Sequence, residues 1–358
     1  MIKIITVVGA RPQFIKAAAV SRVIAKNSDL KELLVHTGQH FDANMSDIFF
    51  DEMEIQKPDY FLGINGLGHG AMTGQMMEKI EALLLKEKPD FLMVYGDTNS
   101  TLAGALAAKK LHIKLIHVEA GLRSFNMNMP EEINRIVTDR ISDLLFCPTD
   151  TAVSNLKKEG FDSIKAKIVK NGDVMQDAAL FYSKINKSTI LERLNIVDSK
   201  FILTTVHRAE NTDSESNLRS IISALNEINS TVKVICPLHP RTSKIVAKLG
   251  IKIQFQIIEP VGYFDMISLL QNCSLVMTDS GGVQKEAFFF GKPCVTMREE
   301  TEWLELVENG FNMLVGSASS KILESVNTML SKKLDFSLDL YGKGKASDVI
   351  VESILNFE

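Results

Sequence analysis

The chain has 358 residues, of which 45% are hydrophobic and 23% charged, and this composition is typical of a folded globular enzyme with more than one hydrophobic core. Its 40 basic and 44 acidic residues give a net charge of −4, which argues against a surface for nucleic acid or anionic membrane. The four cysteines are too widely spaced for a zinc site or a redox dithiol, and no apolar run approaches membrane-spanning length. We therefore expect a cytoplasmic protein without metal or cofactor and without nucleic-acid or membrane partners.

The first half of the chain alternates short apolar runs with longer amphipathic stretches. This alternation is typical of a parallel sheet with helices on both faces. The candidate strands cover residues 3–8, 32–36, 91–95, 115–118 and 144–147, and the candidate helices cover residues 15–25, 73–86, 101–111 and 131–142.

A second series of apolar runs repeats the pattern, and its strands are predicted at residues 201–206, 232–236, 255–258, 275–278 and 294–297. The sequence therefore predicts an α/β protein of two Rossmann-like, doubly wound domains with a central cleft, lined by loops at the carboxyl ends of the strands. We expect an N-terminal domain at 1–175, a C-terminal domain at 176–345, and a terminal helix at 346–358 that crosses back to the first domain.

A serine and two glycines, Ser280, Gly281 and Gly282, separate the predicted strand at 275–278 from a predicted helix. Such a turn exposes backbone N–H groups at a helix N-terminus, where the helix dipole also favours an anion such as phosphate. Glu286 lies about one turn into the helix, where a carboxylate can accept hydrogen bonds from ribose hydroxyls. The alternative is an ordinary helix cap, and for this turn alone the cap is the better interpretation.

Charged residues follow the predicted strands of the first domain. Arg11 and Lys16 bring two cations to a helix N-terminus, which opposes the helix dipole unless an anionic ligand such as a diphosphate binds there. Glu119 ends an apolar strand, and a carboxylate in that position is costly unless it is paired or functional. Asp97 is more readily a helix cap. Glu131, in the first turn of a predicted helix, is as compatible with helix stabilisation as with catalysis.

Two histidines of the second domain, His207 and His239, each lie with an arginine just past a predicted strand. Two such pairs facing one cleft indicate anion binding or acid–base chemistry. His117, within an apolar run, has the position of a structural histidine. The phosphate-binding pattern G-x-x-x-x-G-K-[ST] and a strand-linked G-x-G-x-x-G are both absent from the sequence, which argues against ATP hydrolysis and NAD chemistry.

Taken together, these loops resemble the non-hydrolysing UDP-N-acetylglucosamine 2-epimerase family. The ordered set spans nearly the whole chain, and it is specific although each motif alone is weak. The matching motifs are Gly9-Ala10-Arg11-Pro12, Gly96-Asp97-Thr98, residues 117–123 (HVEAGLR), residues 130–135 (PEEINR), His207-Arg208 and residues 279–286 (DSGGVQKE).

The resemblance implies inversion of carbon 2 of a UDP-linked acetamido sugar by elimination and re-addition of UDP, for bacterial surface polysaccharide such as O antigen. We also expect a homodimer. The implied catalytic residues are Asp97, Glu119, Glu131 and His207, and the implied UDP and diphosphate contacts are Arg11, Lys16, Arg135, His239, Ser280, Gly281, Gly282 and Glu286. The alternatives are a glycosyltransferase of the same fold, a hydrolysing epimerase, and a catalytically inactive nucleotide-sugar sensor.

The chain departs from the common family pattern at Ala10 and Gln13, and residues 126–129 read Asn-Met-Asn-Met. These departures look closer to the branch that acts on UDP-2,3-diacetamido-2,3-dideoxy-glucuronate. Gln39, His40 and His239 match part of a regulatory UDP-N-acetylglucosamine site of bacterial members, whereas residues 41–44 do not. Regulation by that nucleotide-sugar therefore stays open.

Overall fold

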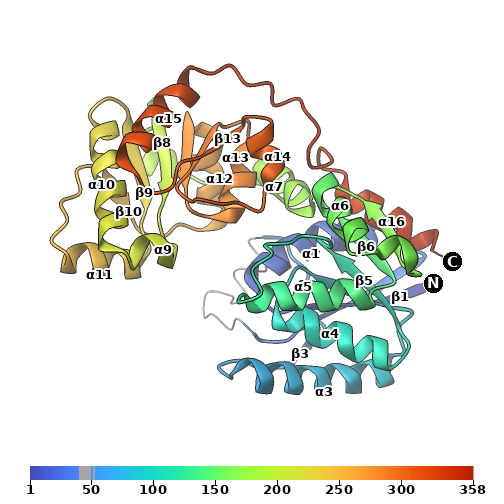
Figure 1. Ribbon diagram of the computed structural model, residues 1–358. Helices are drawn as coiled ribbons and strands as arrows, with labels where there is room; N and C mark the ends of the chain where they lie inside the picture. Colours follow the sequence, from blue (N-terminus) through green and yellow to red (C-terminus); the bar gives the residue numbers. More distant parts are fainter. Residues whose placement is uncertain (40–49, 51–52, 358) are drawn as a thin grey trace. The chain divides into compact units, whose positions relative to one another are not determined.

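The computed structural model describes residues 1–39, 50 and 53–357 (Figure 1). His40 and residues 41–44, which bear on the regulatory site, lie outside the described residues. The chain divides into two compact units, and each is described by itself. Unit 1 comprises Met1–Ala178 and Asp339–Glu358, and unit 2 comprises Ala179–Leu338.

Within its described residues, unit 1 contains a seven-stranded parallel sheet of order β3-β2-β1-β4-β5-β6-β7. The strands are β1 (Ile2–Val8), β2 (Leu30–His36), β3 (Tyr60–Phe61), β4 (Phe91–Tyr95), β5 (Lys114–Val118), β6 (Leu144–Cys147) and β7 (Lys167–Lys170). The helices are α1 (Arg11–Ile24), α3 (His69–Glu87), α4 (Asn99–Lys110), α5 (Pro130–Ile141), α6 (Asp150–Lys158) and α16 (Ala346–Leu355), with a short 3₁₀ helix at Phe161–Ser163.

The core of unit 1 lies between the central strands and the helices that cover them. Connections from β1 to β2 and from β3 to β4 run in opposite directions along the sheet, and because such crossovers are right-handed, α1 and α3 cover opposite faces. Leu92 and Val94 of β4 belong to the same buried cluster as Met76 of α3. Gly104 lets α4 approach β4 closely, since a Cβ at this position would lie 3.2 Å from Val94.

Unit 2 repeats this architecture with a six-stranded parallel sheet of order β10-β9-β8-β11-β12-β13. Its strands are β8 (Phe201–Thr205), β9 (Lys233–Pro237), β10 (Gln256–Ile258), β11 (Leu275–Thr278), β12 (Cys294–Thr296) and β13 (Asn312–Leu314). Its helices are α8 (Ile190–Arg193), α9 (Ala209–Thr212), α10 (Glu215–Asn229), α11 (Pro240–Lys248), α12 (Tyr263–Asn272), α13 (Gly281–Phe289), α14 (Leu304–Glu308) and α15 (Ser319–Ser331), and α7 (Val174–Ile185) runs from unit 1 into unit 2.

The doubly wound α/β fold is confirmed, and the central strands lie where the apolar runs predict them. Helix α1 begins at Arg11 rather than at residue 15, because Pro12 is accepted in the first turn of a helix. The sequence does not predict three strands at or near the sheet edges, β3, β7 and β13. They have only two to four residues, too few to carry a clear apolar pattern.

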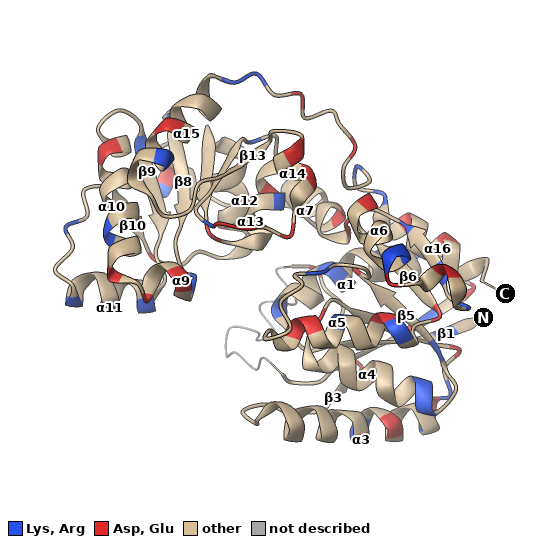
Figure 2. Ribbon diagram, in the orientation of Figure 1, with Lys and Arg blue, Asp and Glu red and all other residues tan. Residues whose placement is uncertain are grey.

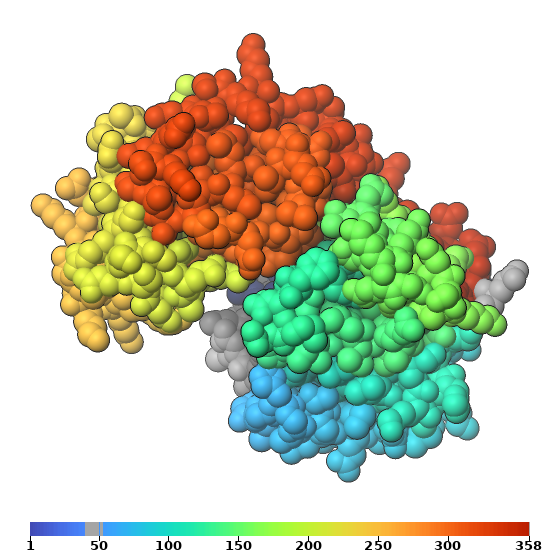
Figure 3. All heavy atoms as spheres, in the orientation of Figure 1, coloured from blue at the N-terminus to red at the C-terminus, as the bar shows by residue number. Residues whose placement is uncertain are grey.

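The C-terminal segment of unit 1 is hydrogen-bonded to the rest of that unit where α7 begins. The Asp173 N–H donates to the Tyr341 carbonyl at 2.8 Å, and the carboxylate of Asp177 accepts from the N–H groups of Ala346 and Ser347 at the start of α16. Helix α16 packs against α1. Figure 3 shows the dark red C-terminal residues beside the green residues of unit 1.

Two glycines bring these segments into backbone contact. Gly172 and Gly342 have φ values of 89° and 88°, which glycine adopts without strain. A Cβ at Gly172 would overlap the carbonyl oxygen of Tyr341.

Basic and acidic residues are distributed over both units (Figure 2). In the part of the chain that the structure describes, no helix combines the length and apolar character that a bilayer crossing requires.

Candidate functional site

The predicted site residues of each unit gather at the carboxyl ends of its parallel strands. In unit 1 strand β1 lies between β2 and β4, and in unit 2 strand β8 lies between β9 and β11. Chain connections diverge at these two points, and ligands of doubly wound sheets bind there. The predicted site residues follow β1, β4 and β5 in unit 1 and β8, β9 and β11 in unit 2, or lie in the helix after one of these strands. They are Arg11, Lys16, Asp97, Glu119, Glu131 and Arg135 in unit 1, and His207, His239, Ser280, Gly281, Gly282 and Glu286 in unit 2.

The centre of the charged group in unit 1 is an ion pair between Glu119 and Lys16. Lys16 Nζ lies 2.5 Å from Glu119 Oε2, and both side chains are largely buried. Glu119 follows β5 with a φ of 70°, an unusual left-handed conformation for a non-glycine residue. Burial by itself would lower the pKa of Lys16, but the charges of Glu119, Asp173 and Asp97 outweigh burial and raise it. Lys16 is therefore a permanent cation beside Glu119.

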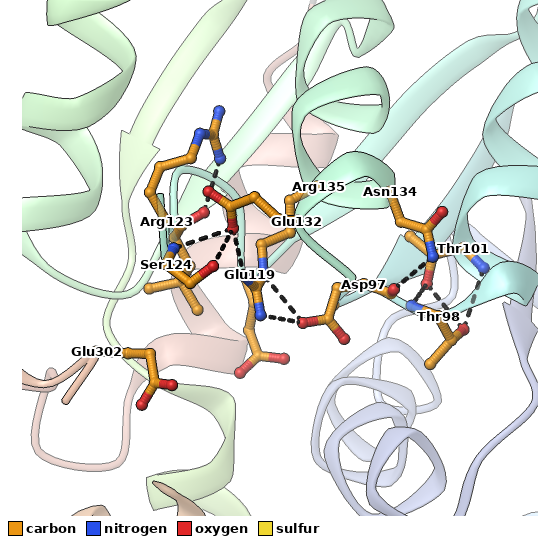
Figure 4. A network of polar contacts seen from close by, with 12 residues as sticks. Asp97, Thr98, Thr101, Glu119, Arg123, Ser124, Glu132, Asn134, Arg135 and Glu302 are labelled. Carbon is orange, nitrogen blue, oxygen red and sulfur yellow. Dashed lines mark hydrogen bonds and ion pairs between the residues drawn. The ribbon is translucent and has the colours of Figure 1, made fainter. Parts of the chain in front are cut away.

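A second charged cluster joins the loop after β4 to helix α5. The guanidinium of Arg135 lies between two carboxylates, with Nη2 2.6 Å from Asp97 Oδ2 and Nη1 2.6 Å from Glu132 Oε2 (Figure 4). Asn134 donates to the carbonyl of Asp97 at 2.8 Å. Asp97 is not the N-cap of the next helix, because Thr98 caps α4. The arrangement holds the Asp97 carboxylate in place and leaves it about one third exposed.

The two glutamates that open α5 have different environments. Glu132 is buried and accepts from the N–H groups of Ser124 and Phe125, at 2.9 Å each. Burial alone would raise the pKa of Glu132, but these hydrogen bonds and Arg135 lower it. Glu131 is exposed at the same helix start. Glu132 therefore anchors the preceding loop, while Glu131 is accessible to a ligand.

The positions that depart from the family pattern also differ in exposure. Gln13 is buried, accepts from the N–H groups of Gly9 and Ala10, and donates to the carbonyl of Tyr95 at 2.6 Å. Ala10 is buried too. Residues 125–128 are exposed, so this loop rather than Gln13 is available for contact with a sugar.

In unit 2, a buried aspartate orients His207. Asp279 Oδ1 lies 3.1 Å from Nδ1 of His207, and the Asp279 carboxylate also accepts from the N–H groups of His207 and Arg208. Burial alone would raise the pKa of Asp279, but its hydrogen bond with His207 leads the interactions that lower it. An Asp-oriented imidazole presents its Nε2 as a proton acceptor when neutral. The side chain of His207 is 47% exposed.

Helix α13 offers backbone amides to an anion. Its N-cap, Ser280, makes no side-chain cap hydrogen bond, and the first turn carries no acid. Gly281 and Gly282 therefore place N–H groups at a helix N-terminus that favours phosphate.

A pocket of about 290 Å³ lies beside this turn. Its lining combines apolar residues Val206, Pro237 and Met266 with polar residues His207, His239 and Ser280. His239 also caps α11 by accepting from the Arg241 N–H at 3.2 Å.

Sequence reasoning did not single out three acids that contact the candidate residues within each unit: Asp173, Asp279 and Glu132. Asp173 is buried, and its charge contributes to the raised pKa of Lys16. Asp279 and Asp173 each follow an apolar run directly or within a few residues, and Glu132 is one of two acids in the first turn of a predicted helix. The partners of Asp279 and Asp173 lie far away in the chain and carry no local signal.

Similarity to known proteins identifies the family of the chain. The sequence matches the model of the UDP-N-acetylglucosamine 2-epimerase family over residues 22–355. The UDP-2,3-diacetamido-2,3-dideoxy-D-glucuronate 2-epimerase of Pseudomonas aeruginosa is 60% identical over 351 residues, which are 98% of each chain.

Two solved structures share the fold over the whole chain. The UDP-GlcNAc 2-epimerase of Methanocaldococcus jannaschii, in complex with UDP-GlcNAc and UDP, has a TM-score of 0.84 at 43% identity, over 100% of this chain and 99% of that one. The Neisseria meningitidis enzyme bound to UDP-GlcNAc has a TM-score of 0.87 at 31% identity, over 99% of this chain and 100% of that one. The family predicted from the motifs is thus confirmed. The chain belongs to the UDP-N-acetylglucosamine 2-epimerase family, a family of isomerases that act on UDP-linked sugars.

Proposed function

We propose that the protein inverts carbon 2 of UDP-2,3-diacetamido-2,3-dideoxy-D-glucuronate, or a closely related UDP-sugar, by elimination and re-addition of UDP. The observation that carries the chemistry is the buried Glu119, held beside the permanent cation Lys16 in a strained backbone conformation. The choice of sugar is supported by the 60% identity with the Pseudomonas enzyme of that name. UDP-GlcNAc is the second candidate, favoured by the 43% identity with the Methanocaldococcus enzyme.

The reaction needs two proton-transfer groups and a stabilised leaving group. A base removes the proton from carbon 2 while the bond from carbon 1 to the diphosphate oxygen breaks, which leaves a double bond between carbons 1 and 2. Carbon 2 then receives a proton on its opposite face, and UDP adds back to carbon 1. We assign these transfers to the group formed by Asp97, Glu119, Glu131 and His207, whose members are carboxylates and an Asp-oriented imidazole.

We assign the binding of the departing diphosphate to cations of unit 1 and backbone amides of unit 2. Charge develops on the diphosphate as carbon 1 releases it, and fixed N–H donors and cations stabilise that charge. In unit 2 the candidates are the amides of residues 280–282, with Glu286 on the ribose and His239 in the lining of the pocket. In unit 1 they are Arg11, Lys16 and Arg135, and the last two also form ion pairs with Glu119 and Asp97.

Deuterium exchange tests the proposal directly. The protein is incubated in heavy water with each candidate UDP-sugar, and the carbon-2 proton is followed by NMR. We expect deuterium at carbon 2 with UDP still attached, and faster exchange with the diacetamido-uronate than with UDP-GlcNAc. Accumulation of free UDP and free sugar would favour the hydrolysing alternative. Absence of exchange with every candidate sugar would rule out the proposed function.

The role of the glycine turn is testable without disturbing the fold. A Cβ at Gly282 would meet no atom within 4 Å, so Gly282→Ala should fold normally and gain roughly 0.5–1 kcal/mol of helix propensity. If phosphate approaches this amide, the added methyl should weaken UDP binding about tenfold, or about 1.4 kcal/mol by calorimetry. Gly74→Ala in α3 is the control, because Gly74 is equally open and lies in unit 1. Unchanged UDP affinity in Gly282→Ala would place the phosphates elsewhere.

We further propose that the protein acts as a cytoplasmic homodimer in surface polysaccharide synthesis. All four cysteines are buried free thiols, which supports a reducing compartment. The proposed homodimer is based on the family resemblance. Light scattering during gel filtration measures the molar mass and so tests this oligomeric state.

A further inference from the structure

His117 is buried in unit 1 behind the two loops that carry Asp97 and Glu119. It lies on β5 and its side chain is fully buried. Its Nε2 is 2.7 Å from the carbonyl oxygen of Gly96, and its Nδ1 is 2.7 Å from Asp139 Oδ1. A carbonyl oxygen only accepts hydrogen bonds, so Nε2 carries a hydrogen.

The surroundings of Asp139 determine the state of the other ring nitrogen. Asp139 Oδ2 accepts from the Gly121 N–H at 3.1 Å and from Arg123 Nη1 at 2.7 Å. Two N–H donors, one of them a guanidinium, favour the ionised carboxylate. An ionised carboxylate only accepts, so Nδ1 of His117 carries a hydrogen as well.

The result is a chain of alternating charges that crosses the interior of unit 1. The imidazolium of His117 pairs with Asp139, Asp139 pairs with Arg123, and Arg123 forms two hydrogen bonds of 2.7 and 2.8 Å with Glu159. Each buried charge therefore has an opposite neighbour, which is the condition for keeping ions in an interior.

We propose that His117 is a positioning residue for the epimerase reaction: as a buried imidazolium paired with Asp139, it fixes the ends of β4 and β5 relative to each other. Gly96, its carbonyl partner, directly precedes Asp97. Gly121, which Asp139 holds, lies two residues beyond Glu119. One buried pair thus sets the spacing of two candidate proton-transfer groups, and an error of about 1 Å in such spacing lowers rates by about 10²-fold.

This proposal rests on the proposed function for the reaction that it serves, but its first test does not. The ring nitrogens of all histidines are labelled with ¹⁵N in the full-length protein, and their protonation is recorded by NMR. We expect His117 to show two protonated ring nitrogens. His36 is the internal comparison, because its Nδ1 accepts from the Gly38 N–H and burial lowers its pKa to about 4. A single protonated nitrogen at His117 would overturn the assignment of this residue as an imidazolium, whereas the positioning role is tested by the two substitutions below.

The second test separates positioning from space filling. His117→Phe keeps a ring in the core but removes both hydrogen bonds. We expect kcat for carbon-2 exchange to fall roughly 10- to 100-fold, with little change in KM or in UDP affinity. If His117→Phe does not fold, His117→Asn is measured instead. The control is His112→Asn at an exposed position with a φ of 60°, which asparagine tolerates. A folded His117 variant with the kcat of the unmodified protein would overturn the proposal.

The third test uses an isosteric change in the partner. In Asp139→Asn, the amide N–H₂ can donate to Nδ1 of His117 while the amide oxygen accepts from Gly121 and Arg123. Every hydrogen bond is kept, but the imidazole becomes neutral. We expect the NMR signal of the Nδ1 proton to disappear and kcat to stay within about threefold, since geometry rather than charge supplies the effect. A loss of kcat as large as that of His117→Phe would overturn the positioning role.

The results of these three tests can be distinguished from a failure of the proposed function. If the unmodified protein exchanges carbon 2 of no UDP-sugar, the proposed function is wrong, and the positioning role for that reaction falls with it. The NMR measurement would still report the charge of His117 independently.

Discussion

Glu119→Gln should abolish carbon-2 exchange while leaving UDP binding nearly intact. The amide has almost the same shape but neither accepts nor donates a proton in acid–base catalysis. We expect exchange to fall about 10³-fold, within the range for loss of a general acid or base. The substitution also removes the anion that pairs with Lys16, so it tests the contribution of the whole Lys16–Glu119 ion pair. Deuterium incorporation by NMR measures the first effect, and calorimetry with UDP measures the second.

A second glutamate of unit 1 provides the matched control. Glu32 of β2 accepts a hydrogen bond from Thr6 at 2.5 Å, and burial, the leading cause, raises its pKa. It lies on another strand, so Glu32→Gln should keep full exchange activity. Equal loss of exchange and UDP binding in Glu119→Gln would instead assign Glu119 a structural role.

Gly172→Ala should destabilise unit 1 by about 2–4 kcal/mol, because two costs combine. The backbone has a φ of 89°, which disfavours any residue with a Cβ, and the new methyl would overlap the carbonyl oxygen of Tyr341. For a unit of this size we expect the melting temperature to fall by roughly 6–12 °C. Calorimetric unfolding of the full chain measures the change.

Gly66→Ala isolates the backbone cost. Gly66 has a φ of 68° in the same unit, and a Cβ there would meet no atom within 4 Å. Its destabilisation should be only about 1–2 kcal/mol. If the two variants lose equal stability, close packing against Tyr341 contributes nothing.

The fold was predictable where the chain is most regular. Central strands such as β4 and β11 are buried on both faces and appear as unbroken apolar runs. Because parallel strands end at one edge, the loops after them could be grouped from the sequence. The short strands at or near the sheet edges have no such run, and their formation depends on a neighbouring strand already in place.

The candidate site was predictable as a set of loops, but its pairings were not. Sequence reasoning expected the Glu119 carboxylate to be paired or functional, and the structure pairs it with Lys16 of helix α1. Neither interpretation of Lys16 from the sequence considered this pair. Likewise, His117 has the apolar neighbours of a structural histidine, and only the fold brings Asp139 to it. Long-range ion pairs leave no periodicity in a sequence, so they emerge only from the assembled structure.

The close approach of Gly172 and Gly342 determines where the chain can be cut to separate its two units. Unit 2 is one continuous segment, whereas unit 1 consists of two. Hydrogen bonds of Asp173 and Asp177 with backbone groups join the end of the first segment to the start of the second. Unit 2 is therefore an insertion within a host domain whose cut ends already lie side by side. Replacing residues 179–338 with a short flexible linker should yield an isolated host domain, and the excised segment can be expressed as an uninterrupted gene fragment. Unit 1 and unit 2 then become separate parts that can be recombined between relatives.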